Sequence, residues 1–447
     1  MTDNAARITL EVLEAVFGKD NQIGFRLWDG TSWPDDGLHE ATVVLKHPGA
    51  LRAMLLPPNE VNMGEAYLYD DFDIEGNVEA AFEAAQPLLR DGLGWRTRLG
   101  LALKLLRLPA GREAEAGPRG RAQMRGHQHS IDRDRQAIAY HYDVSNDFYS
   151  LWLDSRMVYS CAYFVSPDDD LDTAQARKLD YICRKLRLKP GQRLLDIGCG
   201  WGGLVIHAAQ HYGVDATGIT LSQPQADLAN ERIAEAGLED RCRVQMRDYR
   251  EMDEDDPYDA LASVGMFEHV GEGLLPVYFQ QAWALLKPTG VFLNHGIAVH
   301  ADQEERPGNS FSDTYVFPDG ELVPISTTLR IAEETHFKVR DVESLREHYA
   351  LTLRHWVRRL EARHEEALQF VNEPTYRVWR LFMSGSAYGF ATGDLNVYQT
   401  LLVKPDTDGA SHLPLSRKDW YEEGETKGIV EQRKEAKERV PVQGSGE

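Results

Sequence analysis

Apolar runs and amphipathic stretches alternate along the chain between about residues 130 and 300. The apolar runs predict five strands, at 193–198, 215–221, 242–248, 258–267 and 290–298. Because strands that alternate with helices along a chain form parallel sheets, this order predicts a doubly wound α/β domain. Residues 325–405 are more helical and aromatic, and they contain one further predicted strand at 397–404.

The rest of the chain departs from this pattern. The first 90 residues predict a small α+β domain, because a DG turn signal divides the apolar-rich stretch 23–33 and another strand pattern follows at 41–47. The stretch 109–126 is rich in Gly, Pro and Arg, as linkers are. We therefore expect an N-terminal domain, a basic linker with an amphipathic segment, an α/β domain and a polar C-terminal tail, at 1–90, 91–130, 131–405 and 406–447.

The first predicted strand of the α/β domain ends in an acid and a glycine-rich loop, in the sequence LLDIGCGWGGL (194–204). Glycines remove Cβ atoms where the backbone turns tightly and where a ligand approaches closely. A helix is predicted to follow at 203–212, and the start of a helix favours polar or anionic ligands. The loop is therefore a candidate ligand site, with glycines at Gly198, Gly200, Gly202 and Gly203.

Two kinds of ligand use such a loop. A hydride-transfer dinucleotide site needs G-x-G-x-x-G and an acid about 20 residues further on, but the second strand here ends GITLSQPQ, without an acid at its tip. Asp196 instead precedes the glycines, and this D-x-G-x-G layout is typical of a site for S-adenosylmethionine (SAM). We expect Thr220 and Gln225 near the ribose or adenosine, and Asp248 and Tyr249 at the adenine. Taken singly, each could also be an ordinary turn or cap residue.

Charge is distributed unevenly along the chain. The formal net charge of −22 argues against a nucleic-acid partner. Residues 90–136 nevertheless hold eleven Arg or Lys against five Asp or Glu, a local balance of 11 − 5 = +6. Within them, residues 95–108 alternate leucine clusters with basic residues at helical spacing. This segment is either an ordinary surface helix or a helix that lies on anionic lipid, with its basic residues at the headgroups: Arg96, Arg98, Lys104 and Arg107.

The composition otherwise resembles that of a globular protein. No stretch of about 18 apolar residues occurs, and the first residues lack the layout of a signal peptide. The four cysteines have no C-x-x-C spacing, so neither a metal site nor a disulfide framework is indicated. We expect a reduced, cytoplasmic setting, with peripheral association at the inner membrane face. The oligomeric state stays open, with a homodimer as one option.

Several motifs together resemble the cyclopropane fatty acid synthase family of SAM-dependent methyltransferases. They are YSCAYF (159–164), LDIGCGWGGL (195–204), SVGMFEHVG (263–271), YVFPDGEL (315–322), HYDVSNDFY (141–149) and GEAYLYDDFDIEG (64–76). The resemblance implies a Rossmann-like class I SAM-dependent methyltransferase fold behind a small α+β N-terminal domain of lipid-binding type, at 1–90. It also implies a substrate, the cis double bond of unsaturated acyl chains in membrane phospholipids. By the same resemblance, Tyr159 and Ser160 join the cofactor-binding residues.

An alkene is a poor nucleophile, so the sulfonium methyl must be held close to it in a dry site. Ring closure then requires a base, which in this family is taken to be bound bicarbonate. The family's motifs assign its binding to Cys161, Glu268, His295, Ile297 through its backbone, and Tyr349. Glu268 would orient the bicarbonate hydroxyl, and His295 and Tyr349 would donate hydrogen bonds. Cation-stabilising rings are expected at Tyr163, Phe164 and Tyr315.

One departure concerns a cysteine that some family members carry, because the matching position here is Ser386. A covalent thiol mechanism at that position is therefore not available. The resemblance leaves the product open between a cyclopropane ring and a methylene or methyl branch. A non-catalytic lipid carrier would have no use for Asp196, Glu268 and His295 together. A small-molecule methyltransferase would leave the basic segment and the N-terminal domain unexplained.

Overall fold

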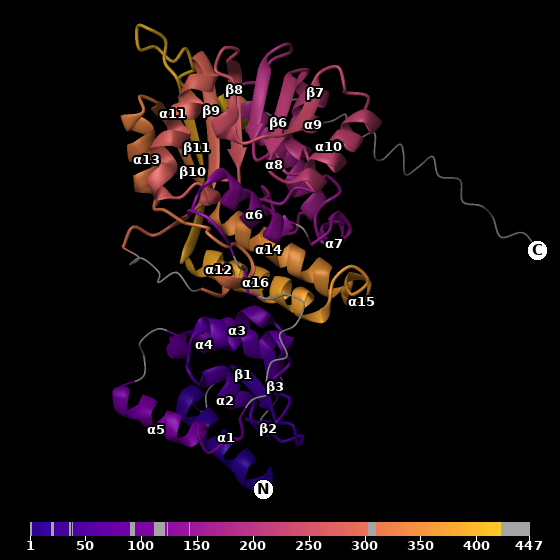
Figure 1. The fold of residues 1–447 in the computed structure, drawn as a ribbon, viewed down its shortest axis with the longest axis vertical. Coiled ribbons are helices and arrows are strands. Elements are labelled where there is room, and N and C mark those ends of the chain that lie inside the picture. Colours follow the sequence, from indigo (N-terminus) through magenta and orange to yellow (C-terminus); the bar gives the residue numbers. More distant parts are fainter. Residues whose placement is uncertain are drawn as a thin grey trace, which may run out of the picture.

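The computed structural model describes residues 2–18, 22–34, 37, 39–89, 94–110, 121–122, 124–142, 144–302 and 310–421. A seven-stranded sheet with flanking helices lies at one end of the molecule, and a smaller domain lies at the other (Figure 1). Helices from late in the sequence lie between the two (Figure 1). The arrangement separates a catalytic half from an N-terminal half but leaves them in contact.

The N-terminal domain is the expected α+β unit. Its four-stranded sheet has the order β2-β1-β3-β4, in which β1 and β3 are parallel and the other pairs antiparallel. The strands are β1 (Ile23–Arg26), β2 (Ser32–Trp33), β3 (Ala41–Leu45) and β4 (Phe72–Gly76). The helices are α1 (Thr2–Phe17), α2 (Ala50–Leu55), α3 (Glu60–Leu68) and α4 (Val78–Leu89).

The basic segment begins with a helix, α5 (Trp95–Leu105), that packs against α1 and α2. Leu105 and Leu108 are buried there, so this part of the expected linker is an outer layer of the N-terminal domain. Lys104 forms an ion pair with Glu11 of α1, with Nζ 3.0 Å from Oε2. Most of the Gly/Pro/Arg-rich stretch after it lies outside the described residues.

The large sheet has the strand order β10-β11-β9-β8-β5-β6-β7. The five predicted strands are confirmed and run parallel, and β11 lies antiparallel between β9 and β10. The five are β5 (Arg193–Ile197), β6 (Asp215–Thr220), β7 (Cys242–Met246), β8 (Tyr258–Val264) and β9 (Leu286–Val299), and the further strand predicted at 397–404 is confirmed as β11 (Leu395–Val403). Strand β10 (Lys338–Ser344) was not predicted, because polar residues interrupt its apolar pattern.

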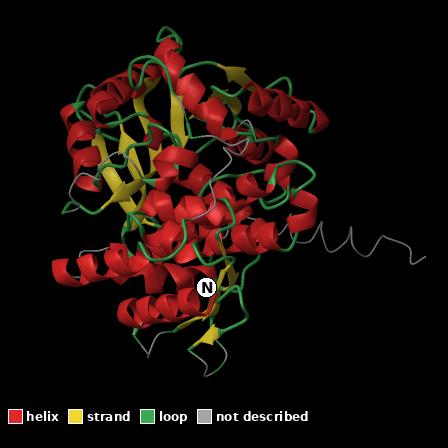
Figure 2. Cartoon of the chain, turned by 60° about the horizontal axis from the view of Figure 1, so that its bottom comes forward, coloured by secondary structure: helices red, strands yellow, loops and turns green. Residues whose placement is uncertain are grey.

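Helices cover both faces of this sheet (Figure 2). Those between or beside its strands are α8 (Leu171–Lys185), α9 (Gly203–Tyr212), α10 (Gln223–Glu235), α11 (Leu275–Leu285), α13 (Ile325–Glu334) and α17 (Lys418–Tyr421). The predicted helix at 203–212 is confirmed. Short 3₁₀ turns follow β7 and β8, at Tyr249–Glu251, Phe267–His269 and Glu272–Leu274.

A helical layer separates the large sheet from the N-terminal domain, with α12, α14 and α16 at its centre (Figure 1). Its members are α6 (Ile131–Tyr142), α7 (Asn146–Ser150), α12 (Phe311–Tyr315), α14 (Arg346–Glu361), α15 (His364–Ala367) and α16 (Glu373–Thr392). Helix α16 packs against α14 on the catalytic side and against α3 and α4 of the N-terminal domain. Helix α16 therefore contacts both halves of the molecule.

Arginines of α14 and α16 tie the N-terminal domain to this layer. Arg354 donates to both carboxylate oxygens of Glu79 at 2.7–2.8 Å. Arg377 donates to the Tyr67 carbonyl at 2.8 Å and Arg380 to the Tyr67 hydroxyl at 2.8 Å. Paired guanidinium–carboxylate contacts of this kind fix orientation as well as distance. The two halves thus form one packed unit.

The beginning of the expected polar tail folds back onto the catalytic half. Trp420 of α17 is buried, and Arg187 forms an ion pair with Asp419. Residues 422–447 lie outside the described part of the chain.

Candidate active site

The glycine-rich loop joins β5 to α9 through positive backbone angles. Gly198 has φ +78°, and a Cβ there would lie 2.5 Å from Met266 Cβ. Gly200 has φ +53°, and a Cβ there would meet no described atom within 4 Å. Gly198 is thus required by a close packing contact, whereas Gly200 borders open space.

Gly200 also lines a cavity of about 110 Å³ at the carboxyl ends of β5, β6 and β8. Nine of the ten residues predicted to bind the cofactor line it: Tyr159, Ser160, Asp196, Gly198, Gly200, Thr220, Gln225, Asp248 and Tyr249. Gly202 is not among its lining residues. It caps α9 with φ +80°, and its Cβ position faces Ala229 of α10 at 3.1 Å. Its place in the structure is that of a turn and packing residue.

A buried acid and a buried lysine meet in this cavity. Burial raises the pKa of Asp196 to about 7, with Lys178 acting in the opposite direction. Oδ1 of Asp196 has no hydrogen-bond partner among the described residues. Lys178 is 1% exposed and donates from Nζ to Ser160 Oγ at 2.8 Å, and burial lowers its pKa to about 8. Lys178 was not predicted, because in sequence it is one more charge on an amphipathic helix.

The far end of the cavity is held by hydrogen bonds between its own lining residues. Thr220 donates to Gln225 Oε1 at 2.7 Å. Arg250 donates to both oxygens of Asp248 at 2.7 Å and to Asp134 Oδ2 at 2.7 Å. The Asp248 carboxylate is therefore fixed beside the ring of Tyr249, which is itself buried.

A larger cavity of about 800 Å³ lies against the first and reaches the N-terminal domain. All five residues predicted to bind the anion line it: Cys161, Glu268, His295, Ile297 and Tyr349. The two cavities share the side chains or backbone of Tyr142, Tyr159, Ser160, Gly265 and His269. A ligand in one is thus separated from a ligand in the other by a single layer of residues.

Glu268 lies in the 3₁₀ turn that follows β8. Its Oε1 accepts the backbone N–H of Ile297 at 2.7 Å, and its Oε2 has no partner in the described structure. Burial raises the pKa of this carboxyl to about 7. The Ile297 N–H, which the family motif assigns to the anion, is thus engaged by Glu268, and one carboxylate oxygen stays available.

His295 lies on β9, and a chain of polar contacts defines its tautomer. Lys185 donates to Gln399 Oε1 at 2.8 Å, so the Gln399 amide nitrogen faces His295 Nδ1 at 3.2 Å. An amide nitrogen only donates, so Nδ1 accepts and the neutral ring carries its proton on Nε2. Burial lowers the pKa of His295, which keeps the ring neutral. Nε2 has no partner among the described atoms, so it is an available donor.

Cys161, in the loop before α8, and Tyr349, on α14, are the other two side chains predicted to bind the anion. Cys161 is fully buried, its Sγ lies 3.6 Å from the Leu345 carbonyl, and burial raises the pKa of its thiol. Burial also raises the pKa of Tyr349, whose ring packs on Phe390 with centroids 4.6 Å apart. Both groups therefore stay protonated at neutral pH and can act only as neutral groups.

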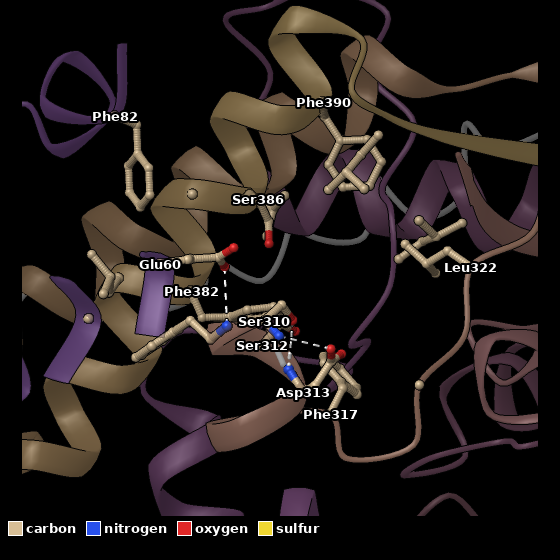
Figure 3. Close-up of a pocket in the computed structure, with 18 of the residues that line it drawn as sticks. Glu60, Phe82, Ser310, Ser312, Asp313, Phe317, Leu322, Phe382, Ser386 and Phe390 are labelled. Atoms are coloured by element: carbon tan, nitrogen blue, oxygen red, sulfur yellow. Dashed lines mark hydrogen bonds between the residues drawn. The ribbon is translucent and has the colours of Figure 1, made fainter. Parts of the chain in front are cut away.

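The expectation about cation-stabilising rings was wrong in its residues. Tyr163 stacks on His348, Phe164 stacks on His355, and the Tyr315 hydroxyl lies 2.6 Å from Glu65, and none of the three is among the residues that line the large cavity. The aromatic side chains that line the cavity in the catalytic half include Tyr142, Tyr159, Phe317, Trp356, Phe382 and Phe390. Ser386, the position of the family's cysteine, also lines this cavity (Figure 3).

Known proteins share both the sequence and the fold. Residues 129–400 match the family described as mycolic acid cyclopropane synthetase. A probable fatty acid methyltransferase of Pseudomonas putida is 41% identical over 403 residues, which cover 89% of this chain and 95% of that protein. The cyclopropane-fatty-acyl-phospholipid synthase of Escherichia coli (strain K12) is 37% identical over 269 residues, 60% of this chain and 68% of that protein.

Among solved structures, mycolic acid cyclopropane synthase CmaA1 complexed with SAH and CTAB superposes with a TM-score of 0.57 at 34% identity. The match covers 60% of this chain and 98% of that chain. These findings confirm the expected family resemblance and the Rossmann-like class I SAM-dependent methyltransferase fold.

Proposed function

The chain belongs to the mycolic acid cyclopropane synthetase family of SAM-dependent methyltransferases, and we propose that it alkylates the cis double bond of unsaturated phospholipid acyl chains to form cyclopropane fatty acids. The large apolar cavity beside the cofactor cavity supports an acyl substrate, because it is lined mainly by aliphatic and aromatic side chains. A small polar substrate would leave most of this surface without a partner.

The smaller cavity fits SAM. When bound, SAM supplies an electrophilic sulfonium methyl group. Its methionine part carries one carboxylate and one ammonium, for which Lys178 and the unpartnered Asp196 Oδ1 provide a donor and an acceptor. The adenosine end would lie against Thr220, Gln225 and Tyr249. The open space at Gly200 leaves room for the ligand to approach the loop backbone.

The observation that carries the proposal is a buried donor and a buried acceptor that face one cavity without partners in the described structure, His295 Nε2 and Glu268 Oε2. A buried polar atom without a partner costs free energy, so such a pair indicates a polar ligand. Bicarbonate fits, because it has an oxyanion that accepts from His295 and Tyr349 and a hydroxyl that donates to Glu268. It would supply the base for proton removal.

The remaining residues keep water away and support positive charge on the acyl chain. Tyr159 and Trp356 have ring centroids 5.2 Å apart, and both rings line the large cavity. Aromatic faces attract cations, and a dry site strengthens that attraction. Because the Cys161 thiol and the Tyr349 hydroxyl stay protonated, neither competes with the anion as a base.

A branched acyl chain is the alternative product to the cyclopropane ring. The Pseudomonas putida relative, whose match extends over 89% of this chain, is named a fatty acid methyltransferase. A methylene-branched or methyl-branched chain would use the same cofactor cavity and the same base. Direct loss of a proton from the new methyl group closes the ring, whereas a hydride shift from the methylated carbon to the neighbouring cationic carbon before that proton loss gives a methylene branch. A saturated methyl branch requires in addition that a separate reductase reduces the methylene group.

Helix α5 supports docking at the membrane surface. Its side chains Trp95, Leu99, Leu103 and Leu106 recur on one helical face and are 54–70% exposed. Arg96, Arg98 and Arg107 flank this apolar face, which suits insertion among anionic headgroups. No helix among those described is long and apolar enough to cross a bilayer. The proposed location is peripheral, at the cytoplasmic face of the inner membrane.

Mass spectrometry of phospholipid fatty acids from cells that express this chain tests the function. A gain of one methylene unit on monounsaturated chains is expected, and it should disappear in the Glu268→Gln variant. A ring and a methylene branch have the same mass, so catalytic hydrogenation before fragmentation distinguishes them. Unmodified lipids in the presence of folded, SAM-binding protein would contradict the proposal.

A further inference from the structure

The large cavity does not end in the catalytic half. Beyond Glu268, His295 and Tyr349 it continues between the two domains and into the core of the N-terminal domain. There it is lined by nine apolar side chains from the small sheet and its helices: Phe17, Ile23, Phe25, Val43, Leu51, Met54, Leu55, Phe72 and Ile74. The core of the smaller domain is thus one end of the same space.

Helix α16 carries the cavity from one domain to the other. Leu381, Phe382, Gly385, Ser386 and Phe390 line it at the spacing of a single helical face. Ser386 and Phe390 of α16 and Phe82 of α4 all line this cavity (Figure 3). A Cβ at Gly385 would lie 2.8 Å from Phe82 Cζ, so glycine permits this approach.

Hydrogen bonds join the two domains around the cavity. Arg354 and Glu79 join α14 to α4, and Arg377 and Arg380 join α16 to Tyr67 of α3. Phe311 N–H of α12 donates to Glu60 Oε1 at 3.3 Å across the same interface (Figure 3). These contacts hold the two domains together where the cavity passes from one to the other.

The lining of the cavity is less polar in the N-terminal domain than around Glu268 and His295. Glu60 is the one charged side chain among the described N-terminal residues that line it, and it is engaged by Phe311. A phospholipid headgroup could not be accommodated in such surroundings, because charged groups lose their hydration there without compensation. The methyl end of an acyl chain carries no polar group and gains from burial at every methylene.

We propose that the core of the N-terminal domain is the binding site for the methyl-terminal part of the acyl chain. The depth of this site then sets how many carbons may lie between the double bond and the chain end. The inference rests on the proposed function, because it requires an acyl substrate at the anion site. It gives the N-terminal domain a role in selecting the substrate in addition to membrane docking.

Three phospholipids with different acyl chains test the proposal. Palmitoleoyl and cis-vaccenoyl chains share the same methyl-terminal segment beyond the double bond, whereas an oleoyl chain is two carbons longer there. Palmitoleoyl and oleoyl chains share the same carboxyl-side segment. Rates on phosphatidylglycerol vesicles of each chain therefore separate selection by the methyl end from selection by the headgroup side.

Two substitutions narrow the N-terminal site, Val43→Phe on β3 and Ala85→Leu on α4. Their matched controls are Val44→Phe and Ala84→Leu, which add the same volume at neighbouring positions that do not line the cavity. The lining variants should lower kcat/KM on oleoyl chains at least tenfold more than on cis-vaccenoyl chains, since each methylene refused burial costs roughly fourfold. The controls should keep the wild-type ratio, and SAM affinity should stay unchanged throughout.

Unchanged ratios in folded lining variants, with an active wild type, would overturn this inference and leave the proposed function standing. A wild type that alkylates none of the three chains would overturn both. Photolysis provides a readout that does not depend on turnover. A phospholipid with a diazirine at the chain terminus should crosslink within residues 23–85, and crosslinks confined to residues after 130 would contradict the proposal.

Discussion

Gln399 of β11 lies directly opposite His295 of β9, and its side-chain amide is 3.2 Å from His295 Nδ1. Since Lys185 holds the amide oxygen, this contact leaves the imidazole proton on Nε2, on the cavity side. Gln399 is therefore a positioning residue, which acts through the histidine. Neither its spacing nor its neighbours in the sequence indicate this.

Gln399→Glu should reverse the tautomer. A carboxylate accepts from Nδ1–H, so Nε2 would lose its proton and could no longer donate to an anion. Turnover should fall on the order of 10²-fold, while SAM affinity stays unchanged. Nitrogen NMR of the histidine ring reports the tautomer directly. Gln245→Glu, the same change at an exposed position of β7, is the control. Normal turnover with a reversed tautomer would exclude the donor role of Nε2.

Glu268→Gln should retain SAM binding, since the residue lines the large cavity and not the smaller one. It should lose turnover by on the order of 10² to 10⁴, because an amide cannot orient the hydroxyl of the base as a carboxylate does. Removal of dissolved CO₂ should slow the wild type, and added bicarbonate should restore it. Rates that ignore bicarbonate in degassed buffer would assign the proton to a side chain, with His295 as the first candidate.

The same carboxyl predicts a pH dependence. Burial raises the pKa of Glu268 to about 7, so the active carboxylate forms as the pH rises and kcat/KM should increase through that value. Stability should change in the opposite direction. The folded state binds this proton more tightly than the unfolded chain, so its contribution is complete below the ordinary pKa and is lost by about pH 7.

Glu268→Gln removes that dependence. In degassed buffer the variant should gain stability over the wild type as the pH rises from 5 to 8, by up to about 3 kcal/mol. Thermal unfolding at both pH values measures the gain, and Glu254→Gln, an exposed carboxyl, should show none. An equal difference at both pH values would mean that Glu268 is not a buried acid with a raised pKa.

The sequence predicted those features of the structure that depend on residues close together in the chain. The strands around the glycine loop were found because each is an apolar run that ends at a turn signal. The residues proposed to hold the anion were named from the family resemblance, and the structure places all five along one cavity. Lys178 and Gln399 were missed, since burial of a polar side chain depends on partners far away in the chain. The Gln399 contact joins positions 104 residues apart. The cavity through α16 was missed for the same reason.

Gly200→Val tests the cofactor loop. The substitution places a branched side chain in open space that the cofactor is proposed to occupy, so SAM affinity by calorimetry should fall at least about tenfold, or 1.4 kcal/mol. Backbone strain is matched by Gly237→Val, because Gly237 has φ +65° and also borders open space, but outside the cavity. Equal SAM affinity in the two variants would remove Gly200 from the site.

The basic residues in α5 and directly after it are expected to bind anionic membrane surfaces. Replacement of four basic residues by glutamine should weaken binding to anionic vesicles: Arg96, Arg98, Lys104 and Arg107. Each charge near an anionic surface contributes about 1 kcal/mol, and salt screens the attraction, so wild-type binding should also fall as salt rises. Lys104 contributes less to the surface than the arginines, since it is already paired with Glu11.

Charge removal elsewhere provides the matched control, at four exposed basic residues of the catalytic half: Lys189, Arg241, Arg330 and Lys338. That variant has the same net charge as the α5 variant but keeps the proposed docking face, so its sedimentation with vesicles should match the wild type. Trp95→Ala and Leu99→Ala should weaken binding without altering its salt dependence, because they remove apolar contact only. Equal sedimentation of the wild type with neutral and anionic vesicles at low salt would exclude docking through this basic face.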